Sequence, residues 1–253
     1  MTICQQIIDE MTALKDEEQM KNLMRFFKTG KGEYGEGDLF LGLKNPQSRE
    51  FVKKYYKDVP LTEIETLLRH PYHEIRFCGF MILVEQFLKL IPKKGFANDI
   101  DRMSQRDQIM QIYLNNSTFC NNWDLVDLSA PKLLGKWYFL ESSVSQIEKE
   151  AIVERYSHSA NLWQRRISMV FTWSTTREKH PEIALRQALL HLGDKHDLMQ
   201  KAVGWMLREV GSVCSKDILR EFLEDNYSKM SRTTLRYAIE KLDSKERKYW
   251  MER

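Results

Sequence analysis

Glycine, proline and long apolar runs are scarce in this sequence. Among 253 residues there are only 11 glycines and 6 prolines, which favours helices and argues against a turn-rich β-fold. The longest apolar run, residues 77–84, is far shorter than the ~20 residues that a membrane span needs. Residues 1–16 also lack the basic and apolar regions of a signal peptide. We therefore expect a protein that makes no contact with a membrane.

Cysteine is scarce too, and its spacing excludes two classes of protein. The four cysteines form neither a C-x-x-C pair nor a Cys/His cluster with zinc spacing. They are Cys4, Cys78, Cys120 and Cys214. We expect reduced, mostly buried thiols in a cytoplasmic protein. His70 and His73 form an H-x-x-H pair without a third ligand, so we assign them structural roles and predict no metal and no cofactor.

Helical periodicity is present along nearly the whole chain, whereas strand patterns are not. Residues 30–37 are rich in glycine, but they lack the G-x-x-x-x-G-K-[ST] order and follow a helix rather than a strand. We interpret them as a flexible loop between helices.

Four stretches share a helix-starting residue that is followed five positions later by a basic residue and an apolar run. The pairs are Pro71/Arg76, Asn161/Arg166, His196/Lys201 and Ser231/Arg236. The last three basic positions are 35 residues apart, a period typical of stacked helix pairs. We predict one all-α domain over residues 1–253, a monomeric solenoid of HEAT-like helix pairs. Stacked pairs curve, so we expect a C-shaped molecule whose concave face is the binding surface.

Four side chains suggest the chemistry of that face. Trp123 and Asp127 are four residues apart, which places an indole and a carboxylate on one side of a helix. Such a pair suits a cationic target. Arg166 adds a guanidinium suited to phosphate, and we expect it near Trp205. The net charge of +3 permits a basic face but does not by itself indicate nucleic-acid binding.

The helix that carries Trp123 has defined ends in the sequence. Asn121 or Asn122 is a suitable N-cap, and Pro131 should end or kink the helix. Asp124 would complement the helix dipole in the first turn. We assign Trp137, Trp163 and Trp173 to the core, and leave Trp250 undecided.

Four segments in order resemble one family. Residues 40–49 resemble an F-L-G-(I/V)-x-x-P-x-x-R segment, and residues 122–127, followed by Leu134 and Gly135, resemble a W-D-x-V-D segment. Residues 161–166 and 200–209 resemble N-x-W-x-x-R and Q-K-A-(I/V)-G-W-x-L-R-E segments. The chain is thereby similar to the bacterial HEAT-like-repeat alkylpurine DNA glycosylases, the DNA alkylation repair enzyme family.

That resemblance implies a role for each candidate residue. Trp123, Asp127 and Trp205 would line a catalytic cleft, and Arg166 would contact the backbone of double-stranded DNA. We add Lys201, Phe26 and Arg165 to the DNA-binding set, although Arg165 could be only a solvated neighbour of Arg166. Some relatives have a tyrosine where this chain offers Phe26 or Phe27, so a hydroxyl group is lost there.

The resemblance also implies a reaction, hydrolysis of the N-glycosidic bond of purines alkylated at N3 or N7, without deep base flipping. Such a purine, for example 3-methyladenine or 7-methylguanine, is cationic and leaves as a neutral base. No general acid is then required, and one aspartate can stabilise the oxocarbenium-like sugar and position a water molecule.

Two other functions remain open from the residues. A non-catalytic DNA-structure-binding relative would bind DNA on the same scaffold but release no base. A protein-binding solenoid scaffold would need an exposed apolar groove and would lack the steep salt dependence of phosphate contacts. Four basic residues fit a phosphate-facing stripe and a plain solvated face about equally well, namely Arg49, Lys53, Lys54 and Lys57.

Overall fold

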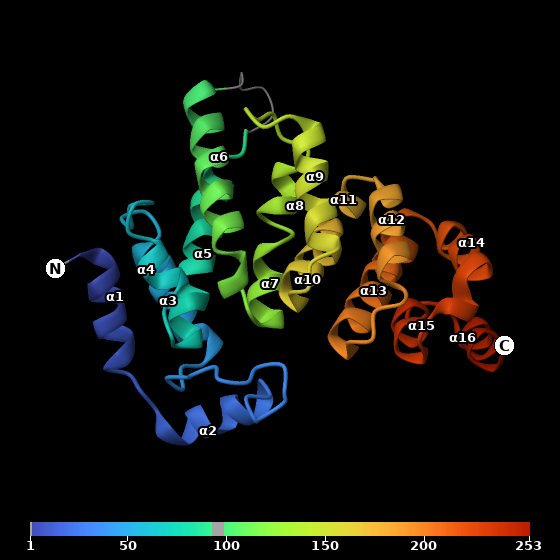
Figure 1. Ribbon diagram of the computed structural model, residues 1–253, viewed down its shortest axis with the longest axis horizontal. Coiled ribbons are helices and arrows are strands. Elements are labelled where there is room, and N and C mark those ends of the chain that lie inside the picture. Colours follow the sequence, from blue (N-terminus) through green and yellow to red (C-terminus); the bar gives the residue numbers. More distant parts are fainter. Residues whose placement is uncertain (1, 93–98) are drawn as a thin grey trace. The chain divides into compact units, whose positions relative to one another are not determined.

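The computed structural model describes residues 2–92 and 99–253 and contains helices joined by loops (Figure 1). In these residues there is no strand, only one isolated parallel bridge between Leu39 and Tyr72. The all-α prediction is therefore confirmed. No helix in the same two ranges is long and apolar enough to cross a membrane.

The described residues form two compact units, the first up to Ser129 together with Glu141–Ser143, the second Ala130–Leu140 and Val144–Arg253. The helices of the first unit are α1 (Ile3–Thr12), α2 (Glu17–Phe26), α3 (Asn45–Tyr55), α4 (Glu65–Leu68), α5 (His73–Leu90), α6 (Ile100–Asn115), the 3-10 turn η1 (Ser117–Phe119) and α7 (Trp123–Ser129). The single domain, the C shape and the concave face stay predictions.

The helices of the second unit follow in chain order. They are α8 (Leu134–Trp137), α9 (Gln146–Ser157), α10 (Leu162–Val170), α11 (Thr172–Arg177), α12 (Pro181–His191), α13 (Asp197–Glu209), the π-helical turn η2 (Val210–Cys214), α14 (Lys216–Asn226), the 3-10 turn η3 (Tyr227–Lys229), α15 (Arg232–Ala238) and α16 (Ser244–Glu252).

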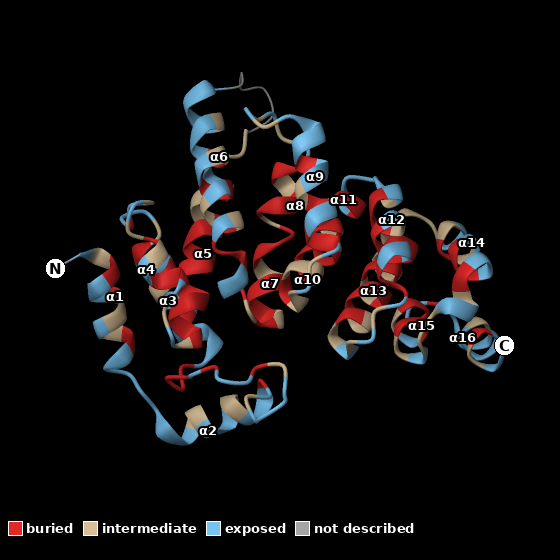
Figure 2. Ribbon diagram, in the orientation of Figure 1, coloured by how far each residue is buried: buried red, intermediate tan, exposed pale blue. Residues whose placement is uncertain are grey.

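Helix α5 is the centre of the first unit. It packs against α3, α4, α6 and α7, and it is buried over most of its length (Figure 2). The apolar run of residues 77–84 lies within it and is buried throughout. A helix that has neighbours on all sides needs apolar residues all round, which explains why its longest apolar run is continuous rather than periodic.

The first turn of α5 also fixes a long loop. The buried carboxylate of Glu74 accepts the backbone N–H groups of Leu41, Gly42 and Leu43 at 2.9, 2.8 and 3.1 Å. A carboxylate that accepts several N–H bonds is fully satisfied and holds the backbone around it in one conformation. The loop before α3 is thereby attached to the helix at the core of the unit.

In the second unit, three helices begin where the repeat predicts. The side chains of Asn161, His196 and Ser231 accept N–H groups of the first turns of α10, α13 and α15. The first stretch differs, because α5 begins at His73 rather than directly after Pro71. Tyr72 has an extended backbone and forms the bridge to Leu39, which delays the start of the helix.

The predictions for the core are largely confirmed. Trp137 and Trp163 are buried, and Trp250 is buried as well. Trp173 is only half-buried, and the guanidinium of Arg177 lies 4.0 Å from the centre of its indole ring. All four cysteines are free thiols, and three of them are buried. Residues 30–37 form a loop, as expected.

Gly42 has a φ of +95°, and a Cβ atom at this position would clash with the backbone carbonyl oxygen of Asp16. Gly42→Ala should therefore lower the free energy of unfolding by roughly 2–4 kcal/mol, from backbone strain and overpacking together. Gly32 is the matched control, because it has φ +79° but open space around it. Gly32→Ala should cost only about 1 kcal/mol. Urea denaturation measures both values, and equal losses would contradict the argument.

Candidate functional site

The short helix α7 carries Trp123 and Asp127. It begins directly after Asn122, whose side-chain oxygen accepts the N–H of Trp123 at 2.9 Å. It ends at Ser129, ahead of Pro131, which confirms the predicted end. Trp123 and Asp127 are one helical turn apart, and both are partly exposed. The indole and the carboxylate are therefore available on one short, well-bounded helix.

Two phenylalanines from the end of α2 pack against Trp123. The ring of Phe27 is stacked on the indole, with centroids 5.4 Å apart and planes inclined by 23°. The ring of Phe26 meets the indole edge-on at 5.9 Å and is 62% exposed, whereas Phe27 is 7% exposed. Phe26 is therefore the exposed ring beside Trp123, and Phe27 is the buried ring stacked on the indole.

A buried histidine packs against Phe27 on the side away from solvent. His73, the first residue of α5, is in contact with Phe27 and is stacked on Phe40, with centroids 4.8 and 4.7 Å apart. Its Nδ1 lies 3.1 Å from a carboxylate oxygen of Asp38, and its Nε2 lies 2.9 Å from a carboxylate oxygen of Asp124. An ionised carboxylate only accepts hydrogen bonds, so both ring nitrogens donate and the ring is an imidazolium.

The electrostatics agree with this assignment. Burial alone would lower the pKa of His73, but the carboxylates of Asp124 and Asp38 outweigh it and raise the pKa from 6.5 to about 9. Arg76 forms an ion pair with Asp38. Although burial opposes it, the His73 and Arg76 charges hold the pKa of Asp38 below its ordinary value. We refer to His73, Asp38, Asp124 and Arg76 as the buried ion network.

The sequence predicted a structural role for His73 but not its partners. His70 is not part of the network, because its Nδ1 accepts the backbone N–H of Tyr72. Within residues 2–92 and 99–253 no three His, Cys, Asp or Glu side chains are grouped so that they could hold a metal ion. Asp124 is in the first turn of α7 as predicted, yet its pairing with His73 gave no signal in the sequence.

The second unit holds the remaining predicted residues on α10 and α13. Arg166 is only 5% exposed, and its guanidinium donates to the carbonyl oxygen of Leu198 at the start of α13. Arg165 forms an ion pair with Asp194 at 2.8 Å. Both arginines therefore have a role in holding α10 against the α12–α13 part of the unit, which the sequence did not indicate.

Lys201 and Trp205 lie one turn apart on α13, and both are partly exposed. The ammonium of Lys201 lies 2.7 Å from a carboxylate oxygen of Asp197, a pair of the i,i+4 type. Trp123, Asp127 and Phe26 belong to the first unit, whereas these residues belong to the second. A single cleft lined by both groups stays a prediction.

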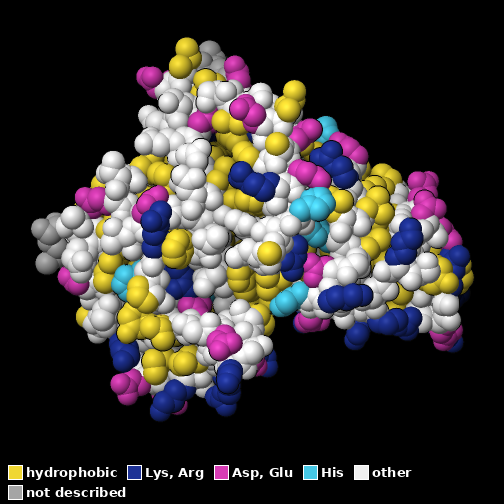
Figure 3. Space-filling view, viewed as in Figure 1, with side chains coloured by type: hydrophobic (Ala, Val, Ile, Leu, Met, Phe, Trp, Pro, Cys, Tyr) yellow, Lys and Arg dark blue, Asp and Glu magenta, His cyan; other side chains and the backbone are white. Residues whose placement is uncertain are grey.

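Charges of both signs are mixed on the surface. On the face drawn in Figure 3, Lys and Arg side chains are interspersed with Asp and Glu. Within the basic stripe in and just after α3, Lys54 forms an ion pair with Glu10 at 2.8 Å, and Arg49 lies over the ring of Phe77 at 5.7 Å. Lys57 lies over the ring of Tyr56 at 5.8 Å, so three of the four stripe residues already have partners in their own unit.

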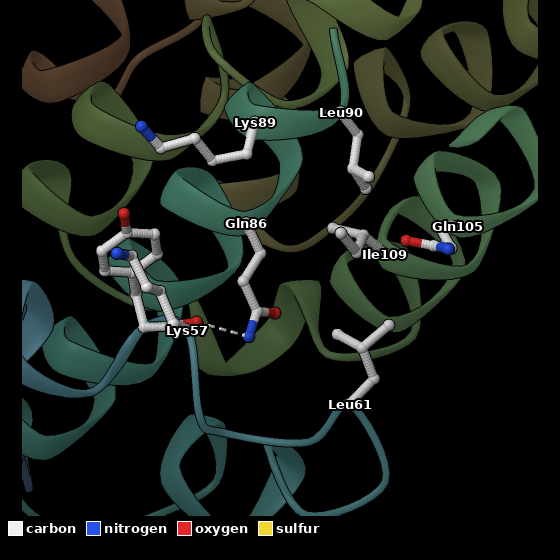
Figure 4. Close-up of a pocket in the computed structure, with 8 residues that line it drawn as sticks. Lys57, Leu61, Gln86, Lys89, Leu90, Gln105 and Ile109 are labelled. Carbon is white, nitrogen blue, oxygen red and sulfur yellow. Dashed lines mark hydrogen bonds between the residues drawn. The ribbon is translucent and has the colours of Figure 1, made fainter. Parts of the chain in front are cut away.

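A separate cavity of about 330 Å³ opens elsewhere in the first unit (Figure 4). It contains none of the predicted site residues. Its lining consists of Tyr56, Lys57, Leu61, Gln86, Lys89, Leu90, Gln105 and Ile109. Gln86 reaches the carbonyl oxygens of Tyr56 and Val59, both at 2.8 Å, and so attaches α5 to the chain after α3.

Comparison with known proteins agrees with this architecture. A family model described as "DNA alkylation repair enzyme" matches residues 7–242. A predicted DNA alkylation repair enzyme from Enterococcus faecalis is similar, with a TM-score of 0.65 and 16% identity over 91% of this chain and 97% of its own. AlkD2 from Streptococcus mutans is similar too, with a TM-score of 0.53 and 14% identity over 90% and 99%. At these identities the likeness supports the fold alone. No curated protein sequence matches the chain.

The buried ion network predicts how stability depends on pH. Because the pKa of His73 is raised from 6.5 to about 9, its contribution to stability is complete below pH 6.5 and is lost as the pH rises through 9. The loss should be on the order of 3 kcal/mol, and it should be absent from His73→Gln. Thermal unfolding of both proteins between pH 6 and 9.5 measures the difference. Parallel curves would mean that His73 is not held as a cation.

Proposed function

The chain belongs to the DNA alkylation repair enzyme family, and from that premise we propose that it is a DNA glycosylase for cationic purines. Its substrates would be purines alkylated at N3 or N7 in duplex DNA, and its reaction the hydrolysis of the N-glycosidic bond. The observation that carries the proposal is the arrangement at α7, where Asp127 follows one turn after Trp123 and the ring of Phe26, from α2, packs against that indole.

The chemistry of the substrate fits a single carboxylate. An alkylated purine already carries the positive charge that makes it a good leaving group, so the protein has no proton to supply. What remains is the positive charge that develops on the sugar as the bond breaks. Asp127 would stabilise that charge and orient the attacking water, and a preorganised carboxylate in a partly dry site is well suited to both tasks.

The aromatic rings would hold the lesion. Indole and phenyl faces attract cations, and Trp123 and Phe26 present two such rings with their planes inclined by 71°. Phe26 is exposed rather than at the bottom of a pocket, which favours contact with a nucleotide at the DNA surface over deep base flipping. Trp205 would act in the same way from the second unit.

Phosphate contacts would come from α10 and α13. Contacts of this kind position the protein on the duplex without reading its sequence. Lys201 has a partly exposed ammonium that could exchange its Asp197 partner for a phosphate. Arg166 and Arg165 complete the proposed set, with Arg166 acting through its small exposed part and its bond to Leu198.

The first test removes the charge of the carboxylate. Asp127→Asn keeps the shape of the side chain, so release of 3-methyladenine or 7-methylguanine should fall by on the order of 10²-fold or more. Affinity for DNA should stay the same or rise slightly, because a negative charge leaves a phosphate-binding site. Chromatography of the released bases, with a no-enzyme blank for spontaneous depurination, gives the rate.

Asp58→Asn is a matched control, because Asp58 is an exposed aspartate of the same unit outside the proposed site, and it should leave the rate unchanged. Near-normal release by a folded Asp127→Asn protein would remove Asp127 from the mechanism. Binding of DNA by the wild-type chain without any release of base would favour the non-catalytic DNA-structure binder.

The second test concerns salt dependence. Lys201→Ala should weaken binding to damaged and undamaged duplex alike. It should also make the slope of the logarithm of the binding constant against the logarithm of salt concentration less steep by about one unit. Arg166→Ala should do the same and should also lower the melting temperature, since the partly buried carbonyl of Leu198 loses the guanidinium donor. Fluorescence anisotropy at several salt concentrations measures the slopes. Unchanged slopes in both variants would mean that α10 and α13 do not meet phosphate.

A further inference from the structure

His73 is connected to the proposed site in two ways. Its Nε2 bonds at 2.9 Å to Asp124, the residue directly after Trp123 in the first turn of α7. Its ring also packs on Phe27, and Phe27 is stacked on the indole of Trp123. One side chain at the start of α5 therefore contacts both the carboxylate of Asp124, the neighbour of Trp123 in α7, and the ring of Phe27, which is stacked on the indole.

Stability alone does not explain such an arrangement. The four members of the buried ion network are each at most 6% exposed. Taking ions out of water is costly, and well-packed apolar residues of similar volume often stabilise a core equally well or better. A charged network does supply direction, because its hydrogen bonds fix the distance and the orientation of the parts that it joins.

From these contacts we propose that His73 is a positioning residue, which fixes the first turn of α7 through Asp124 and thereby the orientation of Trp123. It touches no substrate. Its consequence for catalysis rests on the proposed function, but the positioning itself does not. The Nε2 bond carries this role, whereas the Nδ1 bond joins His73 to Asp38, which Arg76 already holds.

Two substitutions of His73 test the hydrogen bonds of its two ring nitrogens separately. The amide nitrogen of a glutamine falls near the place of Nε2, so His73→Gln keeps a donor for Asp124. The amide nitrogen of an asparagine falls near the place of Nδ1, so His73→Asn keeps a donor for Asp38 and removes the donor that His73 supplies to Asp124. Both variants remove the positive charge, so a difference between them reports on which hydrogen bond is kept and not on the charge, and a normal Trp123 in His73→Gln alone identifies the bond to Asp124.

The first readout uses no DNA. In protein labelled with 5-fluorotryptophan, the ¹⁹F resonance of Trp123 is identified by its absence from Trp123→Phe. His73→Asn should shift or broaden this resonance and leave those of the other five tryptophans in place. His73→Gln should restore it largely to its wild-type position. Asp124→Ala breaks the same bond from the other side and should reproduce the effect of His73→Asn, should that variant fail to fold.

The matched control is His191→Asn. His191 is also a buried histidine, but it belongs to the second unit, bonds to Ser168, and burial lowers its pKa to about 4, so it is neutral. This variant should leave the resonance of Trp123 unchanged. A wild-type Trp123 resonance in both His73→Asn and Asp124→Ala would overturn the proposal, and so would equal shifts in His73→Asn and His73→Gln.

The second readout is the rate of base release. His73→Asn should lower kcat by on the order of 10- to 100-fold, the scale of a small misplacement of a site residue, with affinity for undamaged DNA unchanged. His73→Gln should recover most of the rate. If the wild-type chain releases no base, the proposed function fails while the fluorine experiment still decides the positioning role. A normal kcat in His73→Asn beside an active wild type would overturn the link to catalysis.

Discussion

The imidazolium of His73, held between the carboxylates of Asp38 and Asp124, joins three parts of the first unit that are distant in sequence. Asp38 lies 35 residues before His73, and Asp124 lies 51 residues after it. Removing one partner from such a buried set leaves an uncompensated charge, which typically costs roughly 3–5 kcal/mol. The loop after α2, the start of α5 and the start of α7 are therefore fixed relative to one another by a requirement for charge balance.

The residues of the proposed site pack on this buried ion network. Glu74, the next residue of α5, holds the loop at residues 41–43, and His73 supports the ring of Phe27. Trp123 lies on Phe27, and only then does the surface begin, with Phe26 and the Asp127 side of α7. A ligand at this surface would meet rings that are held from below. That suits a reaction in which the protein supplies orientation and a negative charge rather than a proton.

The sequence predicted local features well. The helix starts at Asn161, His196 and Ser231 and the end of α7 before Pro131 follow from capping and proline rules that act over a few residues. It could not predict which distant polar groups pair, because the pairing of His73 with Asp38 and Asp124 depends on tertiary packing. The burial of Arg166 also depends on tertiary packing and was not predicted. An arginine that binds phosphate and one that bonds to a backbone carbonyl occupy the same position in a helix repeat, so the sequence does not distinguish them. The sequence also left the choice between the adjacent rings of Phe26 and Phe27 open, because it does not show that Phe26 is exposed and Phe27 buried.

The central claim is that the bond between base and sugar is the bond that breaks. Duplex DNA whose purines carry radiolabelled methyl groups at N3 and N7 tests it directly, since the label reports where the methyl group goes. We expect the label to leave the DNA as free 3-methyladenine and 7-methylguanine, with one abasic site for each base released, faster than in the blank without protein. Label transferred to the protein, label lost while the purine stays in the DNA, or release no faster than in the blank would contradict the account.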